Sequence, residues 1–240
     1  MSGHSKWANI KRKKESTDAK RANAFSKLGK ELTVAVKMGG SADPNINRKL
    51  RDVISKCKAS NMPNDNINRC IQKAAGDANS VNYEEIVYEG YGPCGVAIIV
   101  EATTDNKNRT AADVRSIFTK AGGSMGVTGA VGYMFDKKGY ILIENNNVDE
   151  DELMLEVLDA GAEDFISEEG YIEIYTLPDT FSDVLEVVQN KGIETVEADI
   201  RQVASIKKEL SDEESEKLQN FLDKLDDNDD VQSVWHNGDM

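Results

Sequence analysis

Apolar residues in the first third of the chain recur at spacings of three and four, which is typical of amphipathic helices. The first stripe consists of Phe25, Leu28, Leu32 and Val36. Gly39-Gly40 ends it, Asp43-Pro44 is expected to begin a second helix, and Met62-Pro63 separates that helix from a third that stops at Gly76. Three helices with short turns predict a small helical domain.

From Tyr88 onward the pattern alternates between strands and helices. The continuous apolar run 96–100 is typical of a buried strand, and residues 109–121 carry a helical stripe. The glycine-rich segment 127–135 is interpreted as a second strand. Together these segments predict one β-α-β unit.

Residues 140–201 contain a pattern that is complete in itself. Strands are expected over 140–143, 164–167, 171–175 and 193–200, and helices over 149–160 and 180–190. The order β-α-β-β-α-β is the ferredoxin-like motif.

A last β-α-β unit follows, with strands over 202–206 and 231–235 and a helix over 211–225. Two incomplete units flanking a complete motif suggest nesting, and packing side by side is the alternative. The predicted fold class is α+β, an N-terminal helical domain followed by two ferredoxin-like α/β domains, one inserted in the other. The expected boundaries are 1–80 for a basic arm plus three helices, 81–136 with 202–240 for the discontinuous domain, and 137–201 for the insertion.

The charge is divided along the chain. Residues 1–75 hold 17 Lys and Arg against 6 Asp and Glu, a net charge of +11, whereas the whole chain carries −14, so the remainder carries −25. A division of this size suggests two roles: the basic third meets a polyanion, and the acidic remainder keeps the molecule soluble. The alternative is two solvated surfaces of opposite bias.

Several function classes are disfavoured. No run of 18 apolar residues exists, so no membrane partner is expected, and the N-terminus lacks the apolar stretch of a secretion signal. The scattered Cys57, Cys70 and Cys94 argue for a reducing, cytoplasmic setting without disulfides or zinc. With histidines only at His4 and His236, no catalytic residue, metal ligand or cofactor is expected.

The candidate nucleic-acid-binding residues lie mostly in the basic arm. Cations near one surface bind phosphates and release counterions. Those expected to do so are Lys6, Lys11, Arg12, Lys13, Lys14, Lys20 and Arg21. Trp7 among them either stacks on an unpaired base or plugs the helical domain. Lys27, Lys30 and Lys37 extend the positive charge. A helix-turn-helix over 44–75 is disfavoured because the short turn is missing.

A second candidate is the strand-to-helix turn 104–110. Free backbone N–H groups there favour an anion, with Arg109 as a further contact. The alternative is a plain helix cap in which Asp105 or Asn108 accepts backbone hydrogen bonds.

Three other motifs are interpreted as structural. The glycine-rich segments 89–95 and 122–126 match neither a Rossmann nor a P-loop fingerprint and are expected to be turns. Cys94 has no histidine near it in sequence that would activate it. The aspartates between 226 and 230 are expected to form a solvated turn.

Several separate motifs together resemble the YebC/PmpR family. They are the segments 3–11 (GHSKWANIK), 18–21 (DAKR), 61–63 (NMP), 88–93 (YEGYGP), 104–106 (TDN), 108–110 (NRT) and 122–126 (GGSMG), in that order. Cys94 and Arg12 depart from residues common in the family, glycine and histidine. The resemblance implies a cytoplasmic three-domain protein without catalytic residues or cofactor.

Members of that family are described as probable DNA-binding transcriptional regulators, and others as translation factors at the ribosome. The resemblance therefore implies a regulator that binds DNA. The alternative is a ribosome-associated factor that binds ribosomal or transfer RNA and relieves stalling at proline-rich stretches. A third hypothesis, a small-molecule sensor or enzyme built on the ferredoxin-like sheets, has no motif in its favour.

Overall fold

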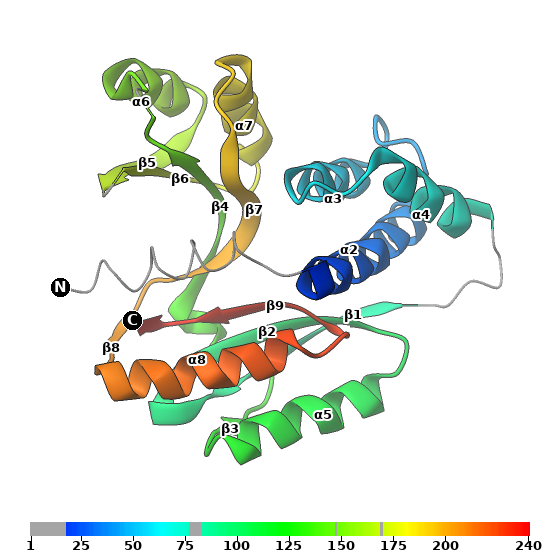
Figure 1. The fold of residues 1–240 in the computed structure, drawn as a ribbon, viewed down its shortest axis with the longest axis vertical. Coiled ribbons are helices and arrows are strands. Elements are labelled where there is room, and N and C mark those ends of the chain that lie inside the picture. Colours follow the sequence, from blue (N-terminus) through cyan, green and yellow to red (C-terminus); the bar gives the residue numbers. More distant parts are fainter. Residues whose placement is uncertain (1–17, 77–82, 147, 169) are drawn as a thin grey trace. The chain divides into compact units, whose positions relative to one another are not determined.

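The computed structural model describes residues 18–76, 83–146, 148–168 and 170–240 of the chain (Figure 1). It divides into two compact units, Met1–Phe135 with Ala204–Met240, and Asp136–Val203. The finer boundaries of three domains stay a prediction. No helix among the described residues is long and apolar enough to cross a membrane.

The helical part of the first unit consists of α2 (Asp18–Gly39), α3 (Arg48–Ala59) and α4 (Asn64–Gly76). The predicted stripes meet in one core. Its fully or nearly buried members are Leu28, Leu32, Ala35, Val36, Leu50, Val53, Cys57, Met62, Ile67 and Ala74. Burial raises the pKa of the Cys57 thiol to about 12, so this cysteine stays protonated and packs as an apolar residue.

The second helix begins later than expected. Pro44 lies in a turn in which the Asp43 carboxylate accepts the backbone N–H of Asn45 at 2.9 Å. Asn47 is the cap of α3: its Oδ1 accepts the Leu50 N–H at 3.0 Å, and its Nδ2 donates to the Ala35 carbonyl at 2.8 Å. The prediction of a start near Pro44 is wrong because a buried asparagine that bridges two helices outweighs the local preference of proline.

The α/β part of the first unit is an antiparallel sheet in the order β3-β1-β2-β9. Its strands are β1 (Glu84–Tyr91), β2 (Ala97–Thr104), β3 (Ser124–Met125) and β9 (Val231–His236). Helices α5 (Lys107–Lys120) and α8 (Asp212–Asp226) cover one face (Figure 1). Phe118 and Phe221 meet edge to face between them, with ring centroids 5.0 Å apart. The α+β class is confirmed.

Two strand predictions are wrong in this part of the chain, and one strand was not predicted. Residues 127–134 form turns and the short 3₁₀ helix Gly132–Met134 instead of a strand, and Phe135 is the first residue of the next strand. No separate strand covers 202–206, because residues 202–204 are the end of the strand Thr195–Ala204. The hairpin strand β1 was missed, because its glycines indicated turns. Three backbone N–H groups of the segment 126–134, those of Gly129, Val131 and Gly132, bond to the side chain of Glu89 and are therefore not available to a strand ladder.

The second unit has the predicted β-α-β-β-α-β order. Its elements are β4 (Phe135–Glu144), α6 (Glu150–Asp159), β5 (Ala162–Glu168), β6 (Tyr171–Thr176), α7 (Phe181–Asn190) and β7 (Thr195–Ala204). The sheet order β5-β6-β4-β7 is that of a ferredoxin-like domain. The boundaries between the two units fall at the first residue of β4 and at the last residue of β7. Two short strands, β8 (Lys208–Glu209) and β10 (Gly238–Asp239), pair in parallel.

Replacing Gly90 tests how closely β1 and β3 approach. A Cβ atom on Gly90 would lie 2.4 Å from the Ser124 carbonyl oxygen, so Gly90→Ala must move backbone. We expect a loss of about 1–3 kcal/mol and a melting temperature lower by roughly 3–10 °C. Gly76→Ala is the control, since nothing lies within 4 Å of its Cβ position. Equal melting temperatures for the two variants would contradict this packing.

Candidate nucleic-acid interface and the Asp230 cluster

Most of the predicted phosphate-binding residues lie outside the described part of the chain. This holds for Lys6, Trp7, Lys11, Arg12, Lys13 and Lys14. Lys20 and Arg21 belong to the first turns of α2, and their side chains are not described. Arg109 is the one predicted site residue whose side-chain contacts are described, and it lies in the first turn of α5.

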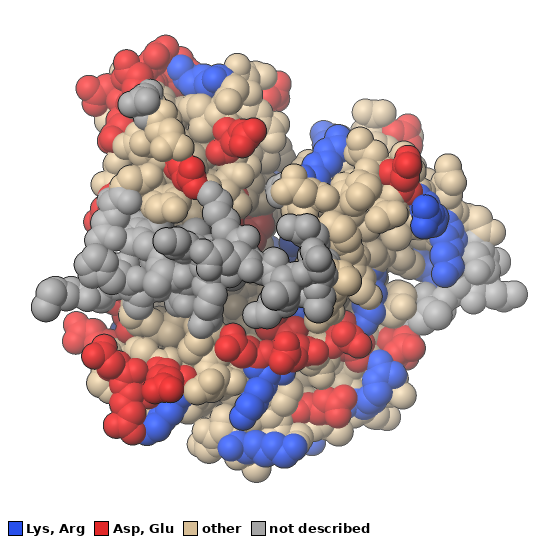
Figure 2. Space-filling view, viewed as in Figure 1, with Lys and Arg blue, Asp and Glu red and all other residues tan. Residues whose placement is uncertain are grey.

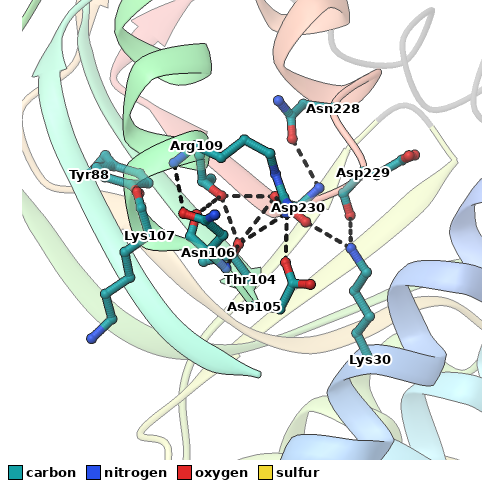
Figure 3. Close-up of polar contacts among 11 residues, drawn as sticks. Lys30, Tyr88, Thr104, Asp105, Asn106, Lys107, Arg109, Asn228, Asp229 and Asp230 are labelled. Carbon is teal, nitrogen blue, oxygen red and sulfur yellow. Dashed lines mark hydrogen bonds and ion pairs between the residues drawn. The ribbon is translucent and has the colours of Figure 1, made fainter. Parts of the chain in front are cut away.

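Asp230, between α8 and β9, is the centre of the polar cluster around Arg109 (Figure 3). The residue is only 7% exposed. Its Oδ1 accepts from Lys30 Nζ at 2.9 Å, and its Oδ2 accepts from Arg109 Nη2 at 2.8 Å. The hydroxyls of Thr110 and Thr104 also donate to Oδ2, at 2.8 and 3.2 Å. One carboxylate thus joins α2, α5, the end of β2 and the start of β9.

Hydrogen bonding decides the charge of Asp230. Burial by itself would raise its pKa, but the donors Arg109, Lys30 and Thr110 outweigh burial and lower the pKa to about 2. Asp230 is therefore ionised at neutral pH, and the cluster is a set of charge-assisted hydrogen bonds.

Local turns hold the residues of the cluster in place. Asn228 Oδ1 accepts the Asp230 N–H at 2.9 Å, and the Asp230 carbonyl accepts the Thr103 N–H at 2.7 Å. On the other side, the side chain of Asn106 caps α5 by accepting the Arg109 N–H at 3.1 Å. The helix cap expected at this turn exists, but the capping residue is Asn106. The prediction of Asp105 or Asn108 as the capping residue is wrong.

Arg109 is held by carboxylates of its own chain. Its Nη2 donates to Asp105 Oδ1 and to Asp230 Oδ2, each at 2.8 Å. An external anion at this helix start would compete with both carboxylates. The anion contact of Arg109 remains a prediction.

Lys27 and Lys30 were expected to extend the positive surface, and the structure instead pairs both with the end of α8. Lys27 Nζ donates to the carbonyl and the carboxylate of Asp226 at 2.6 and 3.1 Å. Lys30 Nζ donates to the carbonyl of Asp229 at 2.8 Å as well as to Asp230. Both lysine side chains are largely buried. A cation at a helix C-terminus satisfies carbonyls and complements the dipole.

The expectation of a solvated turn over residues 226–230 is therefore wrong for Asp230. Its partners Lys30 and Arg109 lie 200 and 121 residues away in sequence. No local pattern signals such pairs, and only the run of lysines at helical spacing on α2 hinted at a facing acid.

Several other cations of the helical domain have partners within the chain, and Arg51, for example, donates to the backbone carbonyls of Pro44 and Asn45. Lys49 pairs with Glu85 at 2.7 Å, and Lys56 pairs with Glu31 at 2.9 Å. Three others are exposed and, within the described ranges, make no side-chain hydrogen bond or ion pair: Lys58, Arg69 and Lys73. These three project from α3 and α4 and are available to an external anion.

A cavity of about 350 Å³ opens beside the Asp230 cluster. It is lined by Lys30 and Arg109 but also by the four aspartates Asp105, Asp113, Asp229 and Asp230. Since carboxylates outnumber cations and already hold both of them, the cavity disfavours phosphate. Across the described residues, no group of three or more His, Cys, Asp or Glu is placed to hold a metal ion.

Asp230→Asn tests the cluster through its pH dependence. Because the folded pKa lies below the ordinary value of 3.8, the stabilisation is present above about pH 4 and is lost as the pH falls towards 2. We expect Asp230→Asn to lower the free energy of unfolding by about 2 kcal/mol or more at pH 7 and to differ less from the native chain near pH 2.

Urea unfolding at pH 7, 4 and 2.5 measures this difference. Asp229→Asn is the matched control, because it removes the same charge one residue away, where only the backbone carbonyl is used by Lys30. A constant difference between Asp230→Asn and the native chain across these pH values would contradict the account.

Two protein-family models match this chain. Residues 5–77 match the family model described as the TACO1/YebC protein N-terminal domain, and residues 83–238 match that of the TACO1/YebC second and third domain. A protein of Clostridium beijerinckii named probable transcriptional regulatory protein is 56% identical over 240 residues, covering 100% of this chain and 98% of that protein. A relative from Acetivibrio thermocellus with the same name is 56% identical over 239 residues, covering 99% and 98%.

A solved structure agrees with the sequence comparison. The crystal structure of a conserved hypothetical protein from Aquifex aeolicus aligns with a TM-score of 0.81 at 40% identity, covering 92% of this chain and 91% of that one. The two family models match consecutive parts of the chain, residues 5–77 and 83–238, and together they cover nearly all of it. The chain belongs to the TACO1/YebC family.

Proposed function

We propose that this protein is a non-enzymatic regulator of gene expression that binds nucleic acid through the cations of its N-terminal third, with DNA as the first target. The observation that carries the proposal is the charge division, +11 over residues 1–75 against −25 over the rest. The curated relatives named probable transcriptional regulatory protein support a regulatory role.

The contacts of the helical domain refine which cations act. Lys27 and Lys30 form ion pairs with Asp226 and Asp230, so they are left out of the proposed interface. The arm cations Lys6, Lys11, Arg12, Lys13 and Lys14, with Lys20 and Arg21, are retained as phosphate contacts. The exposed Lys58, Arg69 and Lys73 extend that surface over α3 and α4.

The acidic remainder limits where a polyanion can bind. Figure 2 shows carboxylates gathered over α6 and over the region of α8. The first turn of helix α6 contains three acidic residues, Glu150, Asp151 and Glu152. Such surfaces repel phosphates, so nucleic acid is directed to the basic third.

Neutralising the arm tests the proposal. The variant Lys11→Gln/Arg12→Gln/Lys13→Gln/Lys14→Gln should lower affinity for duplex DNA by at least about tenfold at 0.1 M salt. It should also reduce the slope of log affinity against log salt by about four, because each lost phosphate contact removes about one released counterion. Fluorescence anisotropy over 50–200 mM salt measures both quantities.

The control removes four cations from exposed positions of the acidic remainder: Lys120, Lys207, Lys217 and Lys224 to Gln. We expect this control variant to keep the native slope. If the arm variant and the control lose affinity equally, the effect is one of net charge and the arm is not the binding element.

The same cations suit the phosphates of ribosomal or transfer RNA, and a further experiment separates the two targets. On DNA, a preferred duplex should outcompete random duplex. If preferred and random duplexes compete equally and the protein sediments with ribosomes at low salt, promoter binding is wrong and the ribosomal role is supported.

A further inference from the structure

Helices α3 and α4 are joined by a turn of four residues, because α3 ends at Ala59 and α4 begins at Asn64. Asn61 in this turn has a φ of 55°, the left-handed conformation that glycine often supplies in turns. Met62 is buried in the core that both helices share with α2 (Figure 1). A turn of about three or four residues is typical of a helix-turn-helix motif. The sequence-based expectation that the short turn is missing is therefore wrong.

The outer face of α4 carries polar side chains in two rows, each with a spacing of four residues along the helix. The rows are Asn64, Asn68 and Gln72, and Asp65, Arg69 and Lys73. The opposite face packs into the core through Ile67 and Ala74. In the part of the chain that the structure describes, none of these polar side chains makes a hydrogen bond or an ion pair. Their donors and acceptors therefore face solvent and can bind another molecule.

The amides on this face do not serve the stability of α4. Asn68 lies in the middle of the helix with an exposed side chain, where asparagine lowers helix stability relative to alanine. Along α8, by contrast, polar side chains four residues apart bond one another, as Lys217 does with Glu213 and Gln219 with Asp223. Side chains that lower helix stability and bond nothing in the chain are typical of a binding surface.

The chemistry of the face matches the major groove of double-stranded DNA. Asparagine and glutamine amides pair with the edge of adenine, arginine pairs with guanine, and the groove is about as wide as an α-helix. Residues 58–76 contain three cations, Lys58, Arg69 and Lys73, against one acid, Asp65, so the charge also suits phosphates. The major groove of double-stranded RNA is too deep and narrow for side chains to read. A protein partner would need an apolar centre, which this face lacks.

We propose that α4 is a recognition helix whose outer face binds base edges in the major groove of double-stranded DNA, while Lys58 binds the phosphate backbone. Lys58 lies beside the start of this face, since it lines an open cavity of about 500 Å³ together with Asn61 and Asn64. From Asn64 to Gln72 the helix rises about 12 Å, the length of roughly three to four base pairs. This inference rests on the proposed function and adds to it the element that selects a sequence.

Selection from a random-sequence duplex library with the full-length native protein supplies the probe. Fluorescence anisotropy then compares the selected duplex of about 20 base pairs with a scrambled duplex of the same composition. We expect Asn68→Ala/Gln72→Ala to lower the preference for the selected duplex about fivefold or more, and to relax it over a contiguous window of about four base pairs. The salt slope should stay the same, because amides carry no charge. Lys58→Gln should instead weaken both duplexes equally and reduce the slope by about one.

The melting temperature of the same variants separates binding from folding. Alanine is a better helix former than asparagine or glutamine, so Asn68→Ala/Gln72→Ala should melt at or above the native temperature. A lost preference in that variant cannot then come from unfolding. The matched control is Gln189→Ala/Asn190→Ala, which removes two exposed amides from the end of α7 in the second unit. This control should keep the native preference and the native slope.

The failures of the two proposals are distinguishable. If the native protein binds duplexes but selection enriches no sequence, or if Asn68→Ala/Gln72→Ala keeps the native preference, α4 does not read bases and this inference is overturned. The arm proposal stands in that case as long as the arm variant still loses its salt slope. Binding to ribosomes without binding to any duplex would overturn both the DNA target and the recognition helix.

Discussion

The buried carboxylate of Asp230 is the constraint on which the first unit depends. It collects charge-assisted hydrogen bonds from Lys30 on α2 and from Arg109 at the start of α5, and it lies where the chain enters β9. Removing any donor would leave a buried charge partly unsatisfied, which is costly. The cluster therefore ties the helical domain, the helix layer and the edge strand of the sheet to one another.

These contacts also divide the cations of the basic third into those that bind within the fold and those that remain at the surface. Lys27 and Lys30 serve the fold, because they neutralise the C-terminal end of α8 and the turn that follows it. Lys58, Arg69 and Lys73 remain at the surface. Net charge alone would count all five as binding residues. Their contacts show that two of them are occupied, so the proposed interface is narrower than the composition indicates.

The elements that were predicted correctly from the sequence are those that depend on a local pattern of apolar residues. The helical stripes of α2, α3 and α4 and the order of the inserted domain follow from periodicity, which acts over a few residues. The strand expected over 127–135 is wrong because the side chain of Glu89, about 40 residues away, accepts three backbone N–H groups of the loop. Asp230 was missed for the same reason, since its partners lie beyond any sequence window. The binding residues of the arm rest on charge pattern and family resemblance and stay proposals.

A double-mutant cycle between Lys30→Met and Asp230→Asn measures how strongly the carboxylate of Asp230 holds α2. The free energy of unfolding of the two single variants and of the double variant gives the coupling of this pair. Because both side chains are largely buried and meet at 2.9 Å, we expect a coupling of about 1 kcal/mol or more. A coupling near zero would mean that Asp230 does not hold α2 in place, and would contradict the account.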